Sequence, residues 1–505
     1  MSVTVGRRYE RPAEPLVERN PLRRQTFDGR LPPAFHDIKD ELPIPILPQH
    51  PDFVEMYWRA WEIAWSRLRA PRPGSGLIVP YQEEPETCNL SMWRNAFLGQ
   101  FGLYGRRLFD FMGLLDNFYA RQHSDGFICS EINPDDGRDY FDPFDPNATG
   151  PNILAWAEWR YFRLTGDDSR FKQVFWPLMA YHRWCRLNRS WPNGLYWATG
   201  LSSGMDNQPR VPGGRSHHRH WSWVDATIQA SLSCLALGRM ATLLREDALA
   251  SELAEERFQL LHLINDQMWN RATGFYHDID AHGRHNPAKS IGAYWALLDN
   301  DLVPMSRFLR FVQHLRDEKA FRRPHSIPSL SADSEGYDAE GGKRWRGGVW
   351  SPMNFIVIKG LRAAARHVQA HGLALRHLQS VSDVFQRTDT LWEYYAAESN
   401  APGKEAKPDY VGWTGLTPIA MLMEDVIGIS VDWPLRRVTW DLRLDTAKNY
   451  GVRNFPLGSE GTASFIGNRR QVEVTTNVPF TMIVNDDRQC VQTRAPAGVS
   501  VIDME

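Results

Sequence analysis

Two helical patterns flank a short irregular loop near the middle of the chain. Residues 171–187 read FKQVFWPLMAYHRWCRL and residues 223–244 read WVDATIQASLSCLALGRMATLL, both with apolar residues at three-to-four spacing. Between them lies SGMDNQPR, residues 203–210. Its glycine permits tight backbone geometry, and its proline stops a helix from running through. Asp206 is therefore predicted to lie in a loop, where it either bonds its own backbone in a turn or faces a ligand.

Similar helical patterns follow one another over most of the chain. They cover residues 53–68, 93–103, 108–119, 153–164, 171–187, 223–244, 249–269, 291–298, 303–315, 349–365, 373–385 and 416–427. A superhelical solenoid would repeat with a period of about 34 to 47 residues, and the sequence shows no such period. The pattern therefore predicts a mainly α fold, an (α/α)6 barrel over residues 51–430, whose loops at one end form a pocket.

The two ends of the chain differ from this middle part. Residues 1–50 are rich in Pro, Arg and Glu and are predicted to form an extended N-terminal arm on the main domain. Residues 438–444 and 471–476 alternate with period two, and 480–484 is a short β-rich run. We expect residues 431–505 to form a small β-rich domain of about five or six strands, with one face covered by the barrel.

The composition is that of a soluble globular enzyme. Of 505 residues, 42% are hydrophobic and 23% are charged, and the net charge of −2 gives no indication of a nucleic-acid or membrane partner. The five cysteines are scattered without a C-x-x-C pair, which argues against a disulfide framework and fits a reducing compartment. No apolar h-region follows the N-terminus and no run approaches 18 apolar residues, so neither a signal peptide nor a membrane span is expected. The expectation is a cytoplasmic protein, with a homo-oligomer left open.

Trp-rich loops later in the chain suit sugar binding. RWRGGVWSPMN, residues 344–354, places two indoles and a guanidinium after a Gly-rich loop, which favours stacking on a sugar and hydrogen bonds to its hydroxyls. A Trp-anchored junction between loop and helix is the structural alternative. EYYAAESN, residues 393–400, and DYVGWTGL, residues 409–416, add carboxylates.

These segments together resemble glycoside hydrolase family 63 and its mannosylglycerate hydrolase, glucosylglycerate hydrolase and trehalase relatives. SGMDNQPR is similar to the general-acid loop of that family, NLSMWRNAF (89–97) to M-W-D-S-A-F, and 344–354 to Y-W-R-G-P-V-W-P-P-M-N. EYYAAESN resembles E-x-Y-x-P-E-T-G, and DYVGWTGL resembles D-x-x-G-W-T-G-L. Arg94 replaces an Asp of the family pattern and Arg344 replaces a Tyr.

The resemblance implies a pair of catalytic carboxylates. Asp206 matches the general acid and Glu393 the general base, with Glu398 as the nearest rival. Inverting glycosidases hold two such carboxyl groups roughly 6.5 to 9.5 Å apart, with room for a water molecule. Because Asp206 and Glu393 are far apart in the sequence, only the closed fold can bring them together.

The remaining candidates are predicted to bind substrate. They are Trp93, Asn207, Arg210, Trp345, Arg346, Trp350, Glu398, Asp409 and Trp413. For Arg210 and Arg346 a structural ion pair is an equal alternative. No cofactor or metal is expected, because the histidines of residues 216–220 have no carboxylate at ligand spacing.

The predicted function is an inverting, exo-acting α-glycoside hydrolase acting on α-linked glucosides. A narrower alternative is a hydrolase of a small solute glycoside such as glucosylglycerate, mannosylglycerate or trehalose. Arg94 and Arg344 would then favour an anionic group on the substrate. Two alternatives of other classes are a non-catalytic sugar-binding barrel, and a lyase or epimerase built on the same barrel.

Overall fold

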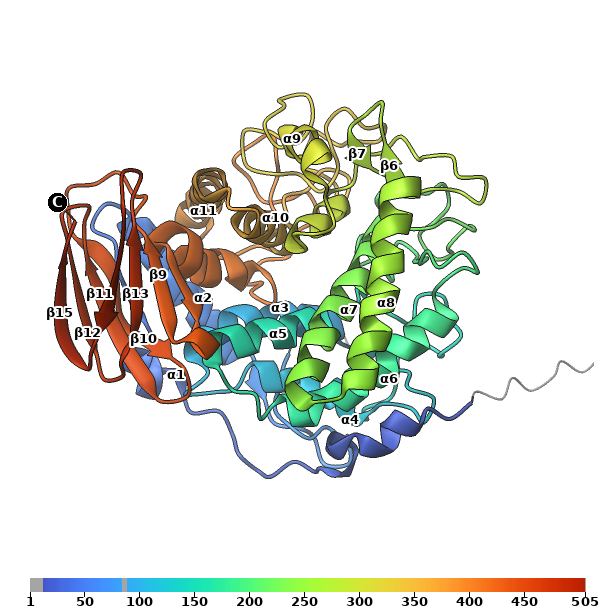
Figure 1. The fold of residues 1–505 in the computed structure, drawn as a ribbon, viewed down its shortest axis with the longest axis horizontal. Helices are drawn as coiled ribbons and strands as arrows, with labels where there is room; N and C mark the ends of the chain where they lie inside the picture. The colour runs from blue at the N-terminus through green and yellow to red at the C-terminus, as the bar shows by residue number, and fades with distance from the viewer. Residues whose placement is uncertain (1–11, 84–88, 505) are drawn as a thin grey trace, which may run out of the picture.

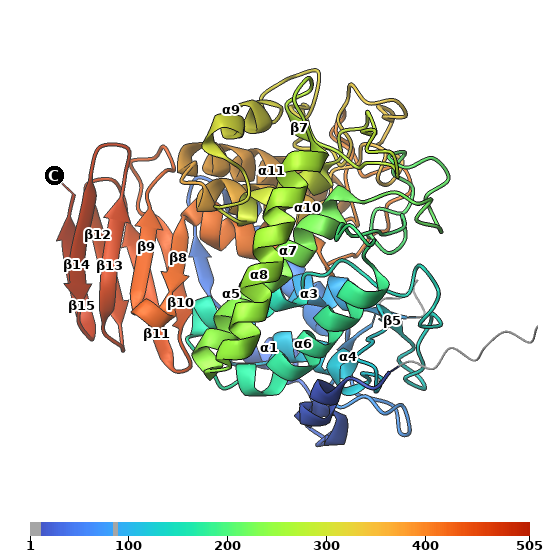
Figure 2. The same cartoon turned by 45° about the vertical axis from the view of Figure 1, so that its right-hand side comes forward.

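The structure is a computed structural model that describes residues 12–83 and 89–504. Helices form the larger part of its regular structure, and a β-rich region follows at the C-terminal end (Figures 1 and 2). The α-helices are α1 (Phe35–Ile38), α2 (Pro51–Ser66), α3 (Met92–Gly102), α4 (Asp116–Ala120), α5 (Leu154–Thr165), α6 (Phe171–Asn188), α7 (Val224–Leu244), α8 (Asp247–Leu263), α9 (Met305–Gln313), α10 (Ser351–Ala363) and α11 (His367–Thr388).

Tighter and wider helical turns join these helices. The 3-10 helices are η1 (Pro15–Arg19), η2 (Pro21–Arg24), η3 (Lys39–Glu41), η4 (Leu103–Gly105), η5 (Met112–Leu115), η7 (Ile291–Leu298), η8 (Thr414–Leu416) and η10 (Trp433–Leu435), and the π-helices are η6 (Ile264–Met268) and η9 (Thr417–Ile427). The predicted helical segments are confirmed as helical. The segment 108–119 is divided into η5 and α4, and 416–427 forms η9 in place of an α-helix.

Helix α7 is apolar on all sides because neighbouring helices surround it. Its length and composition alone would allow it to cross a membrane, but 67% of its apolar window is buried inside the protein. It forms an antiparallel pair with α8 (Figure 1), joined by a tight turn in which Arg245 adopts a left-handed conformation at φ 60°. This helix therefore has the surroundings of a core helix.

The N-terminal ends of three helical elements meet and carry the Trp residues of the predicted site. Trp93 is the second residue of α3, Trp350 precedes α10, and Trp413 precedes η8. The element η8 contacts both α3 and α10. Pro352 near the start of α10 suits this position because its missing N–H would be unpaired there. The loops leading into these helices are thus brought to one place.

The β-rich region consists of two sheets. The first has the order β1-β10-β11-β12-β15 and the second β14-β13-β9-β8. Their strands are β1 (Ile44–Ile46), β8 (Ile429–Asp432), β9 (Arg437–Asp441), β10 (Tyr450–Leu457), β11 (Gly461–Gly467), β12 (Gln471–Thr476), β13 (Phe480–Asn485), β14 (Cys490–Ala495) and β15 (Gly498–Asp503). Short two-stranded pairs elsewhere are β2 (Leu68–Arg69) with β3 (Tyr81–Gln82), β4 (Leu90–Ser91) with β5 (Glu131–Ile132), and β6 (Trp269–Asn270) with β7 (Phe275–Tyr276).

The two sheets cover each other. Phe465 of β11 lies 6.1 Å from Trp440 of β9 and 6.1 Å from Phe480 of β13, measured between ring centroids. The unit therefore has a sheet-on-sheet core, and the helical part also packs against it, since the rings of Tyr104 and of Phe455 in β10 lie 5.6 Å apart. The end of the predicted N-terminal arm takes part as well, because β1 pairs antiparallel with β10. Residues 1–11 of that arm lie outside the described residues.

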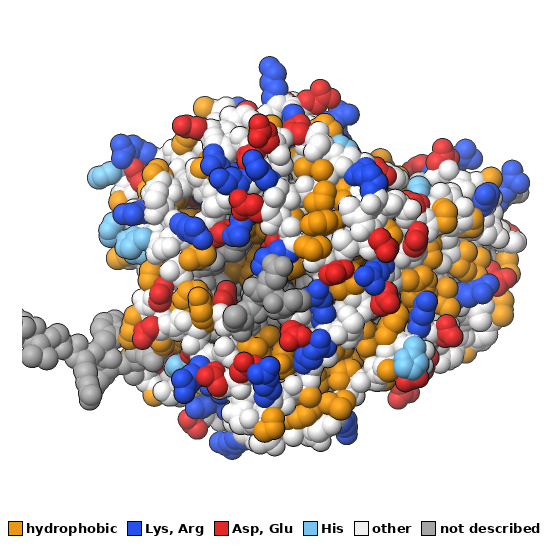
Figure 3. All heavy atoms as spheres, turned by 180° about the vertical axis from the view of Figure 1, so that it is seen from behind, with side chains coloured by type: hydrophobic (Ala, Val, Ile, Leu, Met, Phe, Trp, Pro, Cys, Tyr) orange, Lys and Arg blue, Asp and Glu red, His pale blue; other side chains and the backbone are white. Residues whose placement is uncertain are grey.

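The surface opposite to the view of Figure 1 mixes acidic and basic side chains. Figure 3 shows Lys and Arg next to Asp and Glu across that face, with hydrophobic side chains between them. The near-neutral net charge of −2 is thus reflected in a mixture of both signs on this face.

Candidate active site

The loop that carries Asp206 is held from both sides. Gly204, at φ 75°, lies against the Trp93 indole so closely that a Cβ atom there would be 2.8 Å from Cζ2 of the ring. A larger residue would therefore push the loop off the indole. On the other side, Asn207 donates to the carbonyl of Lys343 at 2.9 Å and accepts from the backbone N–H of Trp345 at 3.0 Å. Asp206 thus has little freedom of position.

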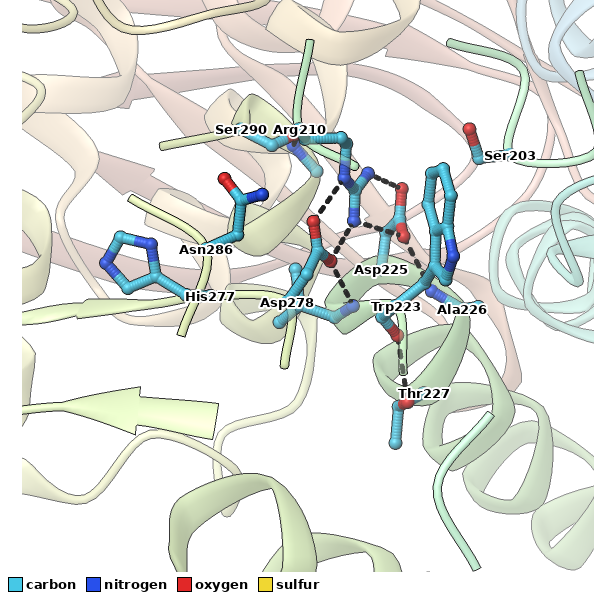
Figure 4. A network of polar contacts seen from close by, with 12 residues as sticks. Ser203, Arg210, Trp223, Asp225, Ala226, Thr227, His277, Asp278, Asn286 and Ser290 are labelled. Atoms are coloured by element: carbon cyan, nitrogen blue, oxygen red, sulfur yellow. Dashed lines mark hydrogen bonds and ion pairs between the residues drawn. The ribbon is translucent and has the colours of Figure 1, made fainter. Parts of the chain in front are cut away.

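Arg210 stabilises the same loop from inside the protein and is not accessible to a ligand. Its guanidinium is fully buried and lies between the carboxylates of Asp225 and Asp278 (Figure 4). Nη1 donates to Oδ2 of Asp225 at 2.6 Å, and Nε donates to Oδ2 of Asp278 at 2.7 Å. Trp223 covers it, 4.6 Å from the ring centroid. The predicted substrate contact of Arg210 is corrected to the structural ion pair, because no surface of this residue is exposed.

Arg344 pairs with one of the candidate catalytic carboxylates, Asp206, and with a second carboxylate, Glu405. Its Nη1 lies 3.3 Å from Oδ2 of Asp206, and its Nε lies 3.2 Å from Oε2 of Glu405. Burial would lower the pKa of this guanidinium, but the charges of Asp206, Glu393 and Glu405 raise it above its ordinary value. Asp206 and Glu405 therefore contact one cation, and the charge of Glu393 also acts on it.

The backbone of Arg344 is fixed in an unfavourable conformation. Its φ of 58° is uncommon for a residue with a Cβ. Its N–H donates to the hydroxyl of Tyr394 at 2.9 Å, and its carbonyl accepts from Nε1 of Trp350 at 3.1 Å. These bonds hold the backbone in the orientation that places the side chain beside Asp206. Strained backbone of this kind is concentrated at functional sites.

Glu393 is positioned through its backbone. Its N–H donates to the carbonyl of Lys407 at 2.9 Å, and its carbonyl accepts from Nε1 of Trp413 at 2.9 Å. The residue is half-buried. The hydroxyl oxygen of the next residue, Tyr394, accepts from the backbone N–H groups of both Arg344 and Glu405, at 2.9 and 3.0 Å. The Glu393 and Arg344 loops are therefore one connected unit.

The four predicted Trp residues gather in one cluster. Trp345 and Trp350 stack with ring centroids 3.9 Å apart, and Trp350 stacks on Tyr394 at 4.5 Å. Trp93 and Trp413 lie 5.3 Å apart and complete the cluster. Because the exposed fractions are only 3 to 9%, the rings mainly support the loops and offer little indole face to a sugar.

Two other predicted substrate residues make contacts that support the surrounding loops. Arg346 donates its Nε to the carbonyl of Gly336 at 2.8 Å, so it stabilises the preceding Gly-rich loop. Asp409 accepts from Oγ1 of Thr390 at 2.6 Å and lies 3.5 Å from Arg59 of α2. Its contacts thus hold its own loop against α2.

Glu398 is engaged by other partners. Its carboxylate accepts two hydrogen bonds from Arg323, at 2.5 and 2.7 Å, and one from Tyr337 at 2.5 Å. Burial would raise the pKa of Glu398, but these donors keep it below its ordinary value. A carboxylate bound in this way is a poor acceptor for a proton from water. This favours Glu393 over its rival as the base.

Arg94 contributes less to the site than its sequence position implies. Its guanidinium lies over the rings of Trp413 at 5.1 Å and Tyr410 at 5.7 Å. Partial burial raises the pKa of the nearby Glu131, while the charge of Arg94 lowers it in part. The guanidinium of Arg94 thus interacts with two aromatic rings and with the charge of Glu131, whereas that of Arg344 contacts Asp206.

One cluster in the described part of the chain has the geometry of metal ligands. His182, Cys234 and Glu256 place a ligand atom each within 4.8 Å of one another among α6, α7 and α8. Glu256 accepts a hydrogen bond from the hydroxyl of Tyr196 at 2.9 Å and pairs with Arg186 at 3.1 Å. Burial would raise the pKa of Glu256, but His182 and Arg186 lower it to about 2. Tyr196, Arg186 and His182 therefore stabilise the charged form of this carboxylate.

The histidines of residues 216–220 lie in a loop whose rings bond to its own backbone. His217 and His218 accept the backbone N–H groups of Arg219 and His220 through Nδ1, at 2.9 and 3.0 Å. In a neutral imidazole, an Nδ1 atom that accepts a hydrogen bond leaves the proton on Nε2. Neither ring therefore presents a free Nε2 lone pair to a metal in this arrangement.

Sequence reasoning missed two residues of the site. Glu405 pairs with Arg344, and Arg215 lies 3.9 Å from Oδ2 of Asp206. Neither belongs to a motif or to a periodic pattern. In the sequence, Arg215 is marked only by its closeness to Asp206. In the structure, the backbone N–H groups of Gly200 and Leu201 donate to the carbonyls of Gly214 and Arg215 and so hold Arg215 in the same loop.

Comparisons with known proteins identify a family for most of the helical region. Residues 115–414 match the family model described as the mannosylglycerate hydrolase MGH1-like glycoside hydrolase domain. An uncharacterised protein of Borreliella burgdorferi is 25% identical over 389 residues, which cover 75% of this chain and 80% of that protein. A probable mannosyl-oligosaccharide glucosidase of Schizosaccharomyces pombe is 24% identical over 282 residues, 53% of this chain and only 33% of the yeast protein.

The fold also matches a solved enzyme. The family 63 mannosylglycerate hydrolase of Thermus thermophilus, solved with glucose, aligns with a TM-score of 0.59 and 19% identity over 72% of this chain and 99% of that chain. The same enzyme has been solved with Tris and D-glycerate, and that structure aligns with a TM-score of 0.57.

The mainly helical fold and the matched family define a glycoside hydrolase. Within that class, the chain belongs to the mannosylglycerate hydrolase MGH1-like glycoside hydrolase family.

Proposed function

We propose that this enzyme hydrolyses α-linked glucosides from their non-reducing end with inversion, on an (α/α)6 barrel. Asp206 is the general acid and Glu393 the general base. The observation that carries this proposal is the guanidinium of Arg344, which contacts Asp206 at 3.3 Å and is influenced by the charge of Glu393. An inverting glycosidase requires two carboxyl groups with room for a water molecule between them.

The proposed reaction uses one proton transfer at each carboxyl group. Asp206 gives its proton to the glycosidic oxygen as the bond to the anomeric carbon breaks. Glu393 takes a proton from a water molecule, whose oxygen attacks the anomeric carbon from the opposite face. The products are the leaving alcohol and a sugar of inverted configuration. The buried Met205 and the stacked indoles exclude bulk water from one side of the site.

The stereochemistry tests the proposal directly. Incubation with a panel of α-linked disaccharides, followed by proton NMR, is expected to show the β-anomer of the released sugar first, with the α-anomer appearing only through mutarotation. A control without enzyme, started from the pure β-anomer, gives the mutarotation rate. Early release of the α-anomer would contradict inversion and would make one carboxylate a nucleophile instead.

A second candidate substrate is a small glycoside with an acidic leaving group, such as mannosylglycerate or glucosylglycerate. Two guanidiniums support it, since Arg344 and Arg215 both lie next to Asp206, on the side where a leaving group must be protonated. The Arg344 side chain is 43% exposed, so it is available to a ligand. The mannosylglycerate hydrolase with the matching fold was solved with D-glycerate.

Replacing Arg344 by Gln separates the two candidates. The KM for mannosylglycerate or glucosylglycerate is expected to rise about tenfold, because one charge-assisted hydrogen bond is lost, while the KM for neutral trehalose changes little. Steady-state kinetics on both substrates measure this difference. Lys343→Ala serves as the control, since it removes a neighbouring exposed charge. An equal rise for acidic and neutral substrates would exclude recognition of an anion by Arg344.

The cytoplasm is also kept as the proposed location. The described cysteines are all free thiols, three of them buried and Cys490 exposed. This pattern is compatible with a reducing compartment. Fractionation of cells that produce the native protein would test it.

A further inference from the structure

A cavity lies at the C-terminal end of α10, the helix that begins next to the aromatic cluster. It has a volume of about 280 Å³ and lies between α5, α7, the end of α10 and strand β8. Helix α10 begins next to Trp350 and reaches this cavity with Lys359 and Arg362. Since α10 has 13 residues, its ends are roughly 20 Å apart. This far cavity is therefore separate from Asp206 and Glu393.

The lining of the far cavity is mainly cationic and apolar. The cations are Arg160, Arg163, Arg239, Lys359 and Arg362, against Glu424 as the acidic residue of the lining. The deeper cations are neutralised: Lys359 pairs with Glu424 at 2.8 Å and with Asp425 at 2.5 Å, and Arg362 pairs with Asp441 at 2.9 Å. The excess charge must therefore lie at the mouth.

The mouth of the far cavity holds more cations than carboxylates. Arg163 binds Asp432 at 2.9 Å, but the same carboxylate also binds Arg437 at 3.1 Å. Within the described residues Arg239 has no ion pair, and it lies over the ring of Trp159 at 5.4 Å. Burial and the charge of Arg163 both lower the pKa of Arg239, while Asp299 offsets this in part.

The partial charges of the helix ends do not neutralise the excess positive charge at the mouth of the far cavity. The C-termini of α5 and α10 carry partial negative charge, which suits Arg163 and Arg362. Arg239, however, lies within α7, before its last turn. Arg163 shares its carboxylate with Arg437, and Arg239 has no ion pair within the described residues, so an added anion would stabilise these two guanidiniums.

The walls of the far cavity are apolar. Trp156, Trp159, Leu232, Leu235 and Leu298 line it. The volume of about 280 Å³ is just below the range of small-molecule pockets, which begins at roughly 300 Å³. The cavity therefore suits a compact ligand with an apolar body and one anionic end.

We propose that the far cavity is a binding site for a small organic anion. Its carboxylate or phosphate lies between Arg163 and Arg239, and its apolar body lies against Trp159 and the leucines. A guanidinium binds both kinds of anion through two parallel N–H groups. The site is independent of the proposed hydrolysis, because none of its lining residues belongs to the Asp206 and Glu393 site.

Isothermal titration calorimetry on the full chain tests this site. Benzoate, phenyl phosphate and inorganic phosphate are titrated, with benzyl alcohol as the uncharged probe. Benzoate or phenyl phosphate is expected to bind, benzyl alcohol much more weakly, and the affinity is expected to fall as salt is raised. The difference in affinity between phenyl phosphate and inorganic phosphate gives the contribution of the apolar body. The difference in affinity between benzoate and phenyl phosphate shows whether the site prefers a carboxylate or a phosphate.

Variants locate the binding. Arg163→Ala with Arg239→Ala is expected to weaken the anion at least about tenfold, and Arg239→Glu alone is expected to do the same. Arg488→Ala removes an exposed arginine from the β13–β14 turn and should leave affinity unchanged. Asp206→Asn should also bind normally, which separates this site from the active site. Absence of binding by every anion at millimolar concentration, or equal binding by the double variant and Arg488→Ala, would overturn the proposal.

Discussion

Replacement of Asp206 by Asn is expected to lower kcat by about 10² to 10⁴, the usual contribution of a general acid. The amide keeps the size of the side chain but cannot give a proton to the glycosidic oxygen. The loop should stay in place, because Gly204, Asn207 and Arg210 hold it through contacts that do not involve the carboxylate. Steady-state kinetics on the best substrate of the disaccharide panel measure the loss.

Two further measurements, substrate binding and the dependence of the rate on the leaving group, show whether Asp206 acts as the acid. Binding of substrate to Asp206→Asn, measured by calorimetry, should be largely retained. Activated substrates such as aryl glycosides, whose leaving groups need no proton, should lose much less rate than the natural linkage. If the variant loses the same factor on both substrates, Asp206 does not act as the acid. If it keeps full activity on both, the proton comes from another group.

Replacement of Glu393 by Gln is expected to reduce kcat to a similar degree, about 10² to 10⁴, because the attacking water then has no base. The backbone bonds of Glu393 to Lys407 and Trp413 remain, so the loop should not move. Activated leaving groups should not restore this variant, since water activation is required for every substrate. This difference in behaviour separates the base from the acid.

Glu398→Gln is the matched control for the base. It removes a carboxylate of the same segment that is bound by Arg323 and Tyr337. Its expected effect is on stability, since a partly buried arginine loses its partner, with kcat on folded protein nearly unchanged. Denaturant unfolding and kinetics measure the two effects separately. A large loss of kcat in Glu398→Gln together with an active Glu393→Gln would exchange the two assignments.

The helical and β-rich parts could be predicted from local patterns. Periodic apolar residues decide which face of a helix is buried, and such patterns are present in segments such as 171–187 and 223–244. Strand β12 agrees with the predicted segment 471–476 for the same reason, since alternation is a local property. The pairing of β1 with β10 was not predictable, because it joins segments from opposite ends of the chain.

The sequence by itself determined the classes of residue available to the site and, by resemblance, which carboxylates to examine. Only the tertiary structure decided the use of each cation, because ion pairing depends on neighbours that are distant in the sequence. Arg210, four residues from Asp206, is buried between Asp225 and Asp278. Arg344, far along the chain, reaches Asp206 because a left-handed backbone conformation, held by Tyr394 and Trp350, directs its side chain there.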